Sequence, residues 1–158
     1  LGKTNQIIKN YDVAISHFNK ALELSNLDPK IYFQIALFYE ETNQLNKVVD
    51  LYYDAVKNHP DNYEIRQTLG IALCSMDYYS QAENEFFAAI EIDFENPEAY
   101  YNLGLVYERQ NKYEDAKSNY EKALDFDSNH QNAKNNLDIL LKNEKEKDWQ
   151  EKRNNQEV

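Results

Sequence analysis

The sequence predicts an all-α solenoid built from repeated helical hairpins, and three observations support this prediction. Residues of one kind recur every 34 positions, as in the series Ala21, Ala55, Ala89 and Ala123. Apolar residues within each unit recur at i, i+3, i+4 and i+7, which is the period of an amphipathic helix. The 158 residues include only three Gly and three Pro, too few for the many turns of an all-β protein. A fixed period of this length is typical of a solenoid, in which each unit buries its apolar face against the next.

The period divides the chain, which we expect to form a single domain, into four units and a tail. We predict a partial repeat in residues 1–28, full repeats in 29–62, 63–96 and 97–130, a capping helix in 131–152 and a disordered tail in 153–158. All three glycines, Gly2, Gly70 and Gly104, occupy one position of the unit. A glycine inside a helix costs about 1 kcal/mol relative to alanine, so we expect close packing between two helices at this position.

The two ends of the chain depart from the full unit. In the first unit we predict a second helix over residues 11–24 and only a short first helix, because the chain begins at the seventh position of the repeat. A half-built hairpin would leave an apolar face poorly covered, so we expect the chain to be cut from a longer parent. At the other end, an apolar stripe over residues 131–143 precedes an almost wholly charged stretch, as expected of a polar-backed cap. Within that stretch, Trp149 either folds back on the capping helix or anchors a contact with a second chain.

The unit 97–130 resembles the tetratricopeptide repeat. A unit of that family carries a large aromatic residue, then Leu-Gly three positions on, then Tyr, and later Ala, an aromatic residue, Ala and Pro. The matching residues are Tyr100, Leu103, Gly104, Tyr107, Ala116, Tyr120 and Ala123, with Ser128 in place of the Pro. The two preceding units match at fewer positions, and the resemblance extends over residues 1–130. It implies a right-handed superhelix of hairpins whose inner face is lined by the first helix of each unit.

The resemblance also implies which side chains face the groove of that superhelix. They are Lys30, Phe33, Gln34 and Leu37 in the first full repeat, Gln67, Thr68 and Ile71 in the second, and Tyr101, Asn102, Leu105 and Arg109 in the third. An apolar stripe flanked by amides suits a peptide, because the amides bond its backbone and the apolar groups take its side chains. The alternative interpretation, that these residues cover neighbouring helices or the convex face, stays open.

One subclass of this family grips the acidic C-terminal tails of heat-shock chaperones with a set of Lys, Asn and Arg residues. The corresponding positions here hold Phe33, Leu37, Thr68, Glu98 and Asn102. The basic clamp is therefore absent. We expect a partner peptide that is neutral or basic rather than a chaperone tail.

Composition argues against several classes of function. The net charge of −11 and the pI of about 4.7 disfavour binding to nucleic acid and to anionic membrane surfaces. The sequence contains no apolar run of about 18 residues and no cleavable apolar leader, so we expect no membrane insertion. With a single cysteine, Cys74, these features favour a cytoplasmic protein.

No group of residues indicates catalysis, a cofactor or a metal site. The histidines fall at different repeat positions, where we expect them to be solvated or capping, and the glycines form no phosphate-binding loop. Cys74 has no neighbouring His or basic residue in the sequence, so we predict a buried or half-buried structural thiol. The leading interpretation is a non-enzymatic scaffold that binds a protein segment. The alternative is a structural or assembly module, which self-associates as a homo-oligomer or packs within a longer multi-repeat protein.

Overall fold

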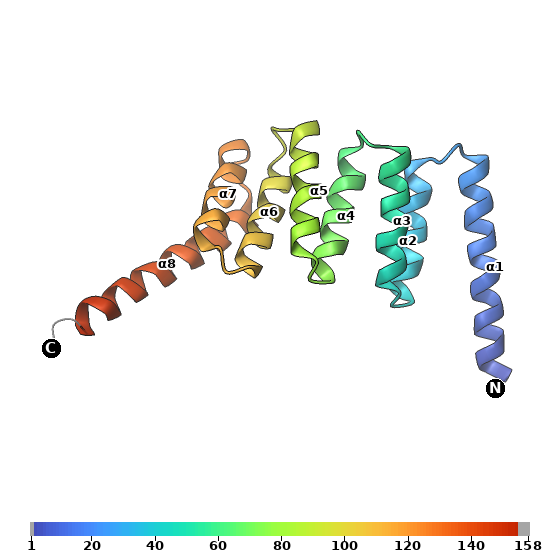
Figure 1. The fold of residues 1–158 in the computed structure, drawn as a ribbon, viewed down its shortest axis with the longest axis horizontal. Helices are drawn as coiled ribbons and strands as arrows, with labels where there is room; N and C mark the ends of the chain where they lie inside the picture. The colour runs from blue at the N-terminus through green and yellow to red at the C-terminus, as the bar shows by residue number, and fades with distance from the viewer. Residues whose placement is uncertain (1, 155–158) are drawn as a thin grey trace.

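The computed structural model of the chain describes residues 2–154, which form eight α-helices and no strand. The helices are α1 (Gly2–Leu24), α2 (Pro29–Glu41), α3 (Leu45–Asn58), α4 (Tyr63–Ser75), α5 (Tyr79–Ile92), α6 (Pro97–Arg109), α7 (Tyr113–Phe126) and α8 (Gln131–Asn154). They stack side by side in chain order, and the two ends of the chain lie at opposite ends of the array (Figure 1). This arrangement confirms the predicted all-α solenoid of helical hairpins.

Each complete hairpin turns at an Asn or Asp with a left-handed backbone. Asn43, Asp77 and Asn111 lie 34 residues apart and have φ angles of 56°, 61° and 60°. Asn and Asp adopt this conformation more readily than other residues with a side chain. These turns separate α2 from α3, α4 from α5, and α6 from α7.

The first helix of each complete hairpin begins at a polar cap. The side chains of Asp28, Asn62 and Asn96 accept hydrogen bonds from backbone N–H groups in the first turn of α2, α4 and α6. Each cap satisfies a backbone donor that the helix itself leaves unpaired, which contributes about 1 kcal/mol. Because this polar position recurs every 34 residues, the start of each first helix is encoded locally.

The core lies where the two helices of a hairpin cross, and the glycines allow that crossing. A Cβ atom built on Gly104 would lie 2.5 Å from Cε1 of Tyr120, and one on Gly70 would lie 2.7 Å from Cε1 of Phe86. Both rings are fully buried. The predicted reason for the glycines, close packing between two helices, is confirmed for Gly70 and Gly104.

The first unit differs from the prediction. We expected a short first helix followed by a second helix from Tyr11, but α1 runs unbroken from Gly2 to Leu24. The position that holds Asn or Asp in the other turns is occupied by Lys9. Lysine lacks the short polar side chain that stabilises the left-handed conformation, so nothing local ends the helix there.

Helix α8 begins one full period after α6 and keeps the repeat spacing. Ala133 and Leu140 are buried, as are Ala99 and Val106 one period earlier. The turn position is occupied by Lys145, and the helix continues to Asn154, two residues beyond the end predicted for the capping helix. The rest of the predicted disordered tail, residues 155–158, lies outside the described residues.

Trp149 is part of α8 itself, and the ribbon of α8 leaves the array obliquely (Figure 1). Its side chain is 61% exposed, and the guanidinium of Arg153 lies 5.4 Å from the ring centroid. The ring therefore does not fold back onto the apolar stripe of this helix.

None of the described helices combines the length and the apolar character needed to cross a membrane.

Candidate functional site

An open pocket of about 370 Å³ lies between helices α4 and α6. Its lining combines apolar side chains with a few polar groups. The lining residues are Ile71, Cys74, Ser75 and Asp77 from the region of α4, Tyr79 and Phe86 from α5, and Asn102, Leu105 and Arg109 from α6. Pockets of this size and mixed character are typical of binding sites for small groups.

The pocket brings together four of the predicted groove residues. Ile71 and Leu105 lie one repeat apart on successive first helices, and Ile71 is 45% exposed. Asn102 is half-buried beside them, and its amide makes no hydrogen bond within the part of the chain that the structure describes. The amide thus has a donor and an acceptor available at an apolar surface, which is the combination that a peptide backbone requires.

One cation and one anion line this pocket. Arg109 is exposed and forms no ion pair with any residue from 2 to 154. The carboxylate of Asp77 accepts a hydrogen bond from the hydroxyl of Tyr79 at 2.5 Å. The pocket is therefore close to neutral, in contrast to the net charge of −11 for the chain.

Cys74 lines the same pocket and is half-buried. Burial raises the pKa of the Cys74 thiol to about 11, and the charge of Arg109 opposes this shift only in part. The thiol is consequently protonated at neutral pH and a poor nucleophile. The prediction of a half-buried structural thiol is confirmed.

Among the described residues, no group of three or more His, Cys, Asp or Glu side chains could hold a metal ion.

The predicted groove residues of α2 lie outside this pocket. Lys30 and Gln34 are exposed, and Leu37 is 59% exposed. Phe33 is half-buried, with its ring centroid 6.0 Å from that of Tyr52 on α3. Phe33 is thus largely engaged with its own hairpin.

The remaining predicted groove residues are Gln67 and Thr68 on α4 and Tyr101 on α6, all half-buried. The Thr68 hydroxyl donates to the carbonyl of Glu64 at 2.6 Å. The Tyr101 ring lies 5.9 Å from the ring of Tyr120 and 4.9 Å from that of His130, measured between centroids. Tyr101 therefore packs against neighbouring elements, as the alternative interpretation of the groove positions expects.

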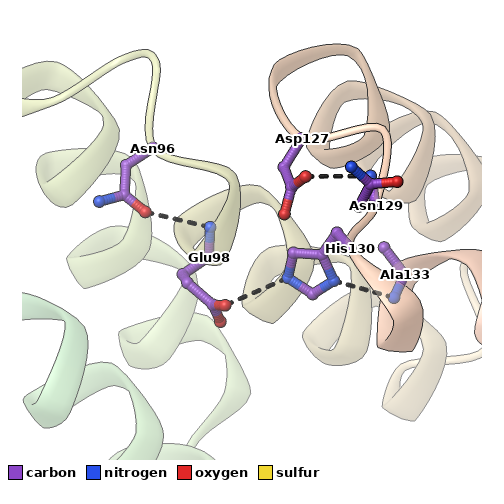
Figure 2. A network of polar contacts seen from close by, with 6 residues as sticks. All are labelled: Asn96, Glu98, Asp127, Asn129, His130 and Ala133. Carbon is purple, nitrogen blue, oxygen red and sulfur yellow. Dashed lines mark hydrogen bonds and ion pairs between the residues drawn. The ribbon is translucent and has the colours of Figure 1, made fainter.

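A polar network joins α6 to the start of α8, beside Tyr101 (Figure 2). Nδ1 of His130 accepts a hydrogen bond from the backbone N–H of Ala133 at 3.2 Å, so His130 caps α8. The other ring nitrogen, Nε2, lies 3.2 Å from Oε1 of Glu98, outside hydrogen-bond geometry. Because Nδ1 accepts, the proton of the neutral ring is on Nε2, which faces the Glu98 carboxylate. The expectation of a capping histidine is confirmed for His130.

Replacing His130 by alanine is expected to lower the free energy of unfolding by about 1 kcal/mol, because the N–H of Ala133 loses its acceptor. His130→Asn should restore most of this loss, since Asn62 and Asn96 cap the equivalent helices. Urea unfolding followed by circular dichroism measures both, with His17→Ala as a control at an exposed histidine. Equal losses for the Ala and Asn variants would contradict the capping role.

Sequence reasoning missed the pocket residues Asp77, Tyr79 and Phe86, and it also missed Ile139 on α8. We treated residues from 131 onward as a departure from the repeat, although the 34-residue spacing itself indicates this position. The four aliphatic residues at one repeat position are Leu37, Ile71, Leu105 and Ile139. Ile139 is 56% exposed, similar to Leu37 and Ile71.

Two family models match the chain. A model described as tetratricopeptide repeat matches residues 97–130, and a model described as TPR repeat matches residues 70–111. Residues 70–130 therefore consist of tetratricopeptide repeats. Repeats of this family generally serve as non-enzymatic scaffolds for protein–protein interaction, and this tetratricopeptide-repeat protein has the architecture of such a scaffold.

Solved structures of similar fold are also tetratricopeptide-repeat proteins. MamA matches with a TM-score of 0.73 and 21% identity over 91% of this chain and 84% of MamA. The Arabidopsis OM64 TPR domain matches with a TM-score of 0.65 and 25% identity, over 72% of this chain and 93% of that domain. The first TPR of Spaghetti (RPAP3), bound to the HSP90 peptide SRMEEVD, matches with a TM-score of 0.66 and 20% identity, over 71% and 89% of the two chains. A search of curated proteins found no match.

Proposed function

We propose that this chain is a non-catalytic scaffold that binds a peptide segment of a partner protein along the inner face of α2, α4, α6 and α8. One aliphatic side chain of the peptide enters the pocket between α4 and α6. The observation that carries the proposal is the pocket itself, which Ile71 and Leu105 line together with Asn102, whose amide has no hydrogen-bond partner among residues 2–154. The peptide backbone bonds to that amide while its side chain is buried beside it.

The affinity of such a complex would come from a small number of peptide side chains that are apolar and become buried in the groove. Fully burying one Leu or Ile side chain contributes about 1.5–3 kcal/mol. The exposed aliphatic residues Leu37 and Ile139 lie one repeat position before and after the pocket residues, so they extend the apolar surface in both directions. Several side chains buried in turn would supply the affinity, and Asn102 would fix the direction and register of the peptide.

We propose that the partner segment is neutral or basic. Arg109 is the single cation among the residues that line the pocket, and it is balanced there by Asp77. The positions where a chaperone-tail clamp carries Lys, Asn and Arg are occupied in this chain by Phe33, Leu37, Thr68, Glu98 and Asn102. An acidic tail would face the carboxylate of Glu98, and the repulsion between like charges disfavours its binding.

A selection from a displayed peptide library tests the proposal. The wild-type chain should enrich peptides that share an aliphatic residue at a fixed position. Ile71→Arg should weaken the affinity of an enriched synthetic peptide by at least about tenfold, because a charge then lies at the pocket. Leu45→Arg, at a partly exposed leucine outside the groove, is the matched control and should leave the affinity unchanged.

Two further measurements complete this test. Asn102→Ala should weaken binding while preserving the preference for an aliphatic residue, since the amide contacts the backbone. The HSP90 peptide SRMEEVD, which is bound in the RPAP3 structure, should not bind. A selection that enriches no peptide, or enriched peptides insensitive to Ile71→Arg, would refute groove binding and favour an assembly role.

A further inference from the structure

Two short acidic segments bring a phenylalanine each to the same edge of the array. One comprises residues 93–95 in the loop between α5 and α6, and the other comprises residues 125–127 at the end of α7. In each segment the phenylalanine, Phe94 or Phe126, stands between two acidic residues. The ring centroids of Phe94 and Phe126 lie 6.5 Å apart with an interplanar angle of 78°, so the rings meet edge to face. The loops that join successive hairpins lie along the edge opposite the hairpin turns (Figure 1).

The cluster of Phe94, Phe126 and Tyr100, here named the aromatic edge, is open to solvent. Phe94 is 63% exposed and Phe126 is 43% exposed, while the buried ring of Tyr100 stacks on Phe126 at a centroid distance of 5.4 Å. Ile92 holds the repeat position of Phe126 in α5 and is 37% exposed, although α6 and α7 follow it in the array. The exposure therefore belongs to this repeat position and does not depend on where the array stops. Exposed aromatic rings in contact with each other are typical of interaction surfaces.

The loop that carries Phe94 is held by hydrogen bonds. The Tyr100 hydroxyl donates to the carbonyl of Phe94 at 3.0 Å. The side-chain amide of Asn96 donates to Oδ2 of Asp93 at 3.2 Å, and the backbone N–H of Asp93 donates to the carbonyl of Ala89 at 3.0 Å. The Phe94 ring thus projects into solvent from a fixed loop, so a ligand that covers it has little additional chain to order.

Four carboxylates surround the aromatic edge. Glu95 and Asp125 are exposed and form no ion pair with any residue from 2 to 154. Asp93 and Asp127 accept hydrogen bonds from uncharged N–H groups, which leave their charge uncompensated. The two exposed rings are therefore bordered by negative charge on both sides, and this combination favours a cationic ligand.

A cation of the chain itself already contacts this cluster. Nζ of Lys122 lies 5.8 Å from the centroid of the Tyr100 ring, within the range of a cation–π interaction. A single lysine can balance at most one of the four carboxylates. The aromatic edge thus keeps a net negative charge after this contact is counted.

We propose that the aromatic edge binds a basic segment of a partner protein that presents an arginine beside an apolar side chain. The guanidinium lies over the Phe94 ring and pairs with the carboxylates of Glu95 and Asp125, because a planar guanidinium both stacks on aromatic rings and bonds to carboxylates. The apolar side chain covers the Phe126 ring. None of these residues lines the groove pocket, so this is a second binding surface. A second copy of this chain, with its net charge of −11, is a poorer partner because the two molecules repel each other.

A fluorescent hexapeptide that alternates arginine with leucine tests the proposal. Anisotropy should show saturable binding to the full chain, and the same peptide with serine in place of leucine should bind at least about fivefold more weakly. Phe94→Ser should also weaken binding of the leucine peptide by at least about fivefold, because it removes an exposed ring without changing the charge. Phe87→Ser is the matched control, since Phe87 is 45% exposed on α5 outside the cluster, and it should leave the affinity unchanged.

Charge variants separate this site from general attraction to an acidic protein. Glu95→Gln combined with Asp125→Asn should weaken binding by at least about tenfold. Glu23→Gln combined with Asp50→Asn makes the same change in net charge at exposed residues of α1 and α3, and should weaken binding less than about twofold. Circular dichroism of each variant shows whether its helices are retained.

The groove variant Ile71→Ser, which also leaves the charge unchanged, should not alter this affinity. Loss of binding in Ile71→Ser but not in Phe94→Ser would place the peptide in the groove and overturn the proposal. Equal weakening by the two double variants would reduce the binding to net charge and overturn it as well. So would absence of saturable binding, or equal affinities of the leucine and serine peptides.

Discussion

Replacing Tyr120 by alanine is expected to lower the free energy of unfolding by about 3–5 kcal/mol, the range for removing a large buried aromatic side chain. Tyr120 is fully buried where α6, α7 and α8 meet. Its hydroxyl donates to Oε2 of Glu108 at 2.7 Å and accepts from Nδ2 of Asn136 at 3.3 Å. The substitution therefore opens a cavity and also breaks polar contacts to the two neighbouring helices.

Urea unfolding followed by circular dichroism measures this loss. Tyr113→Ala is the matched control, because Tyr113 lies on the same helix and is 41% exposed. Hydrogen exchange should place the loss in α6, α7 and α8, since each repeat of a solenoid contacts only its neighbours. Equal losses at positions 113 and 120 would contradict the central packing role of Tyr120.

Gly104→Leu is expected to lower the free energy of unfolding by about 1–3 kcal/mol through overpacking. The first atom of the new side chain would lie 2.5 Å from the Tyr120 ring. That ring cannot retreat easily, because its hydroxyl is held from α6 and from α8. The gain in helix propensity over glycine, at most about 1 kcal/mol, offsets only part of the cost.

Combining Gly104→Leu with Tyr120→Ala should cost less than the two single losses together, because the leucine enters the space that the ring vacates. A favourable coupling of about 1 kcal/mol or more is expected from urea unfolding of the four proteins of the cycle. Gly70→Leu provides the control, since Gly70 faces Phe86 instead and should add independently to Tyr120→Ala. Additive losses for the Gly104 pair would contradict direct contact as the cause.

The sequence by itself determined the hairpins, because the forces that shape them are local. The caps at Asp28, Asn62 and Asn96 start the first helices, and an Asn or Asp at each turn reverses the chain. The 34-residue recurrence of glycine and alanine marked where the helices cross. Each of these features depends on a few neighbouring residues, so a pattern in the sequence is enough to predict it.

The ends of the array were harder to predict from the repeat pattern. The apolar stripe of residues 11–24 and the capping helix over residues 131–152 were evident, yet the continuity of α1 was not anticipated. In both helices a lysine, Lys9 or Lys145, occupies the turn position, and the helix continues through it. The lysine at the turn position is visible in the sequence, but only comparison with the three turns that do form shows that it lets the helix continue.

Only the tertiary structure decided which groove positions are available to a ligand. Tyr101 and Asn102 are adjacent and both match the groove pattern, but Tyr101 packs on Tyr120 and His130 whereas the Asn102 amide has no partner among residues 2–154. The pocket draws side chains from α4, α5 and α6. Such properties depend on side chains far apart in the chain, so repeat spacing alone could not determine them.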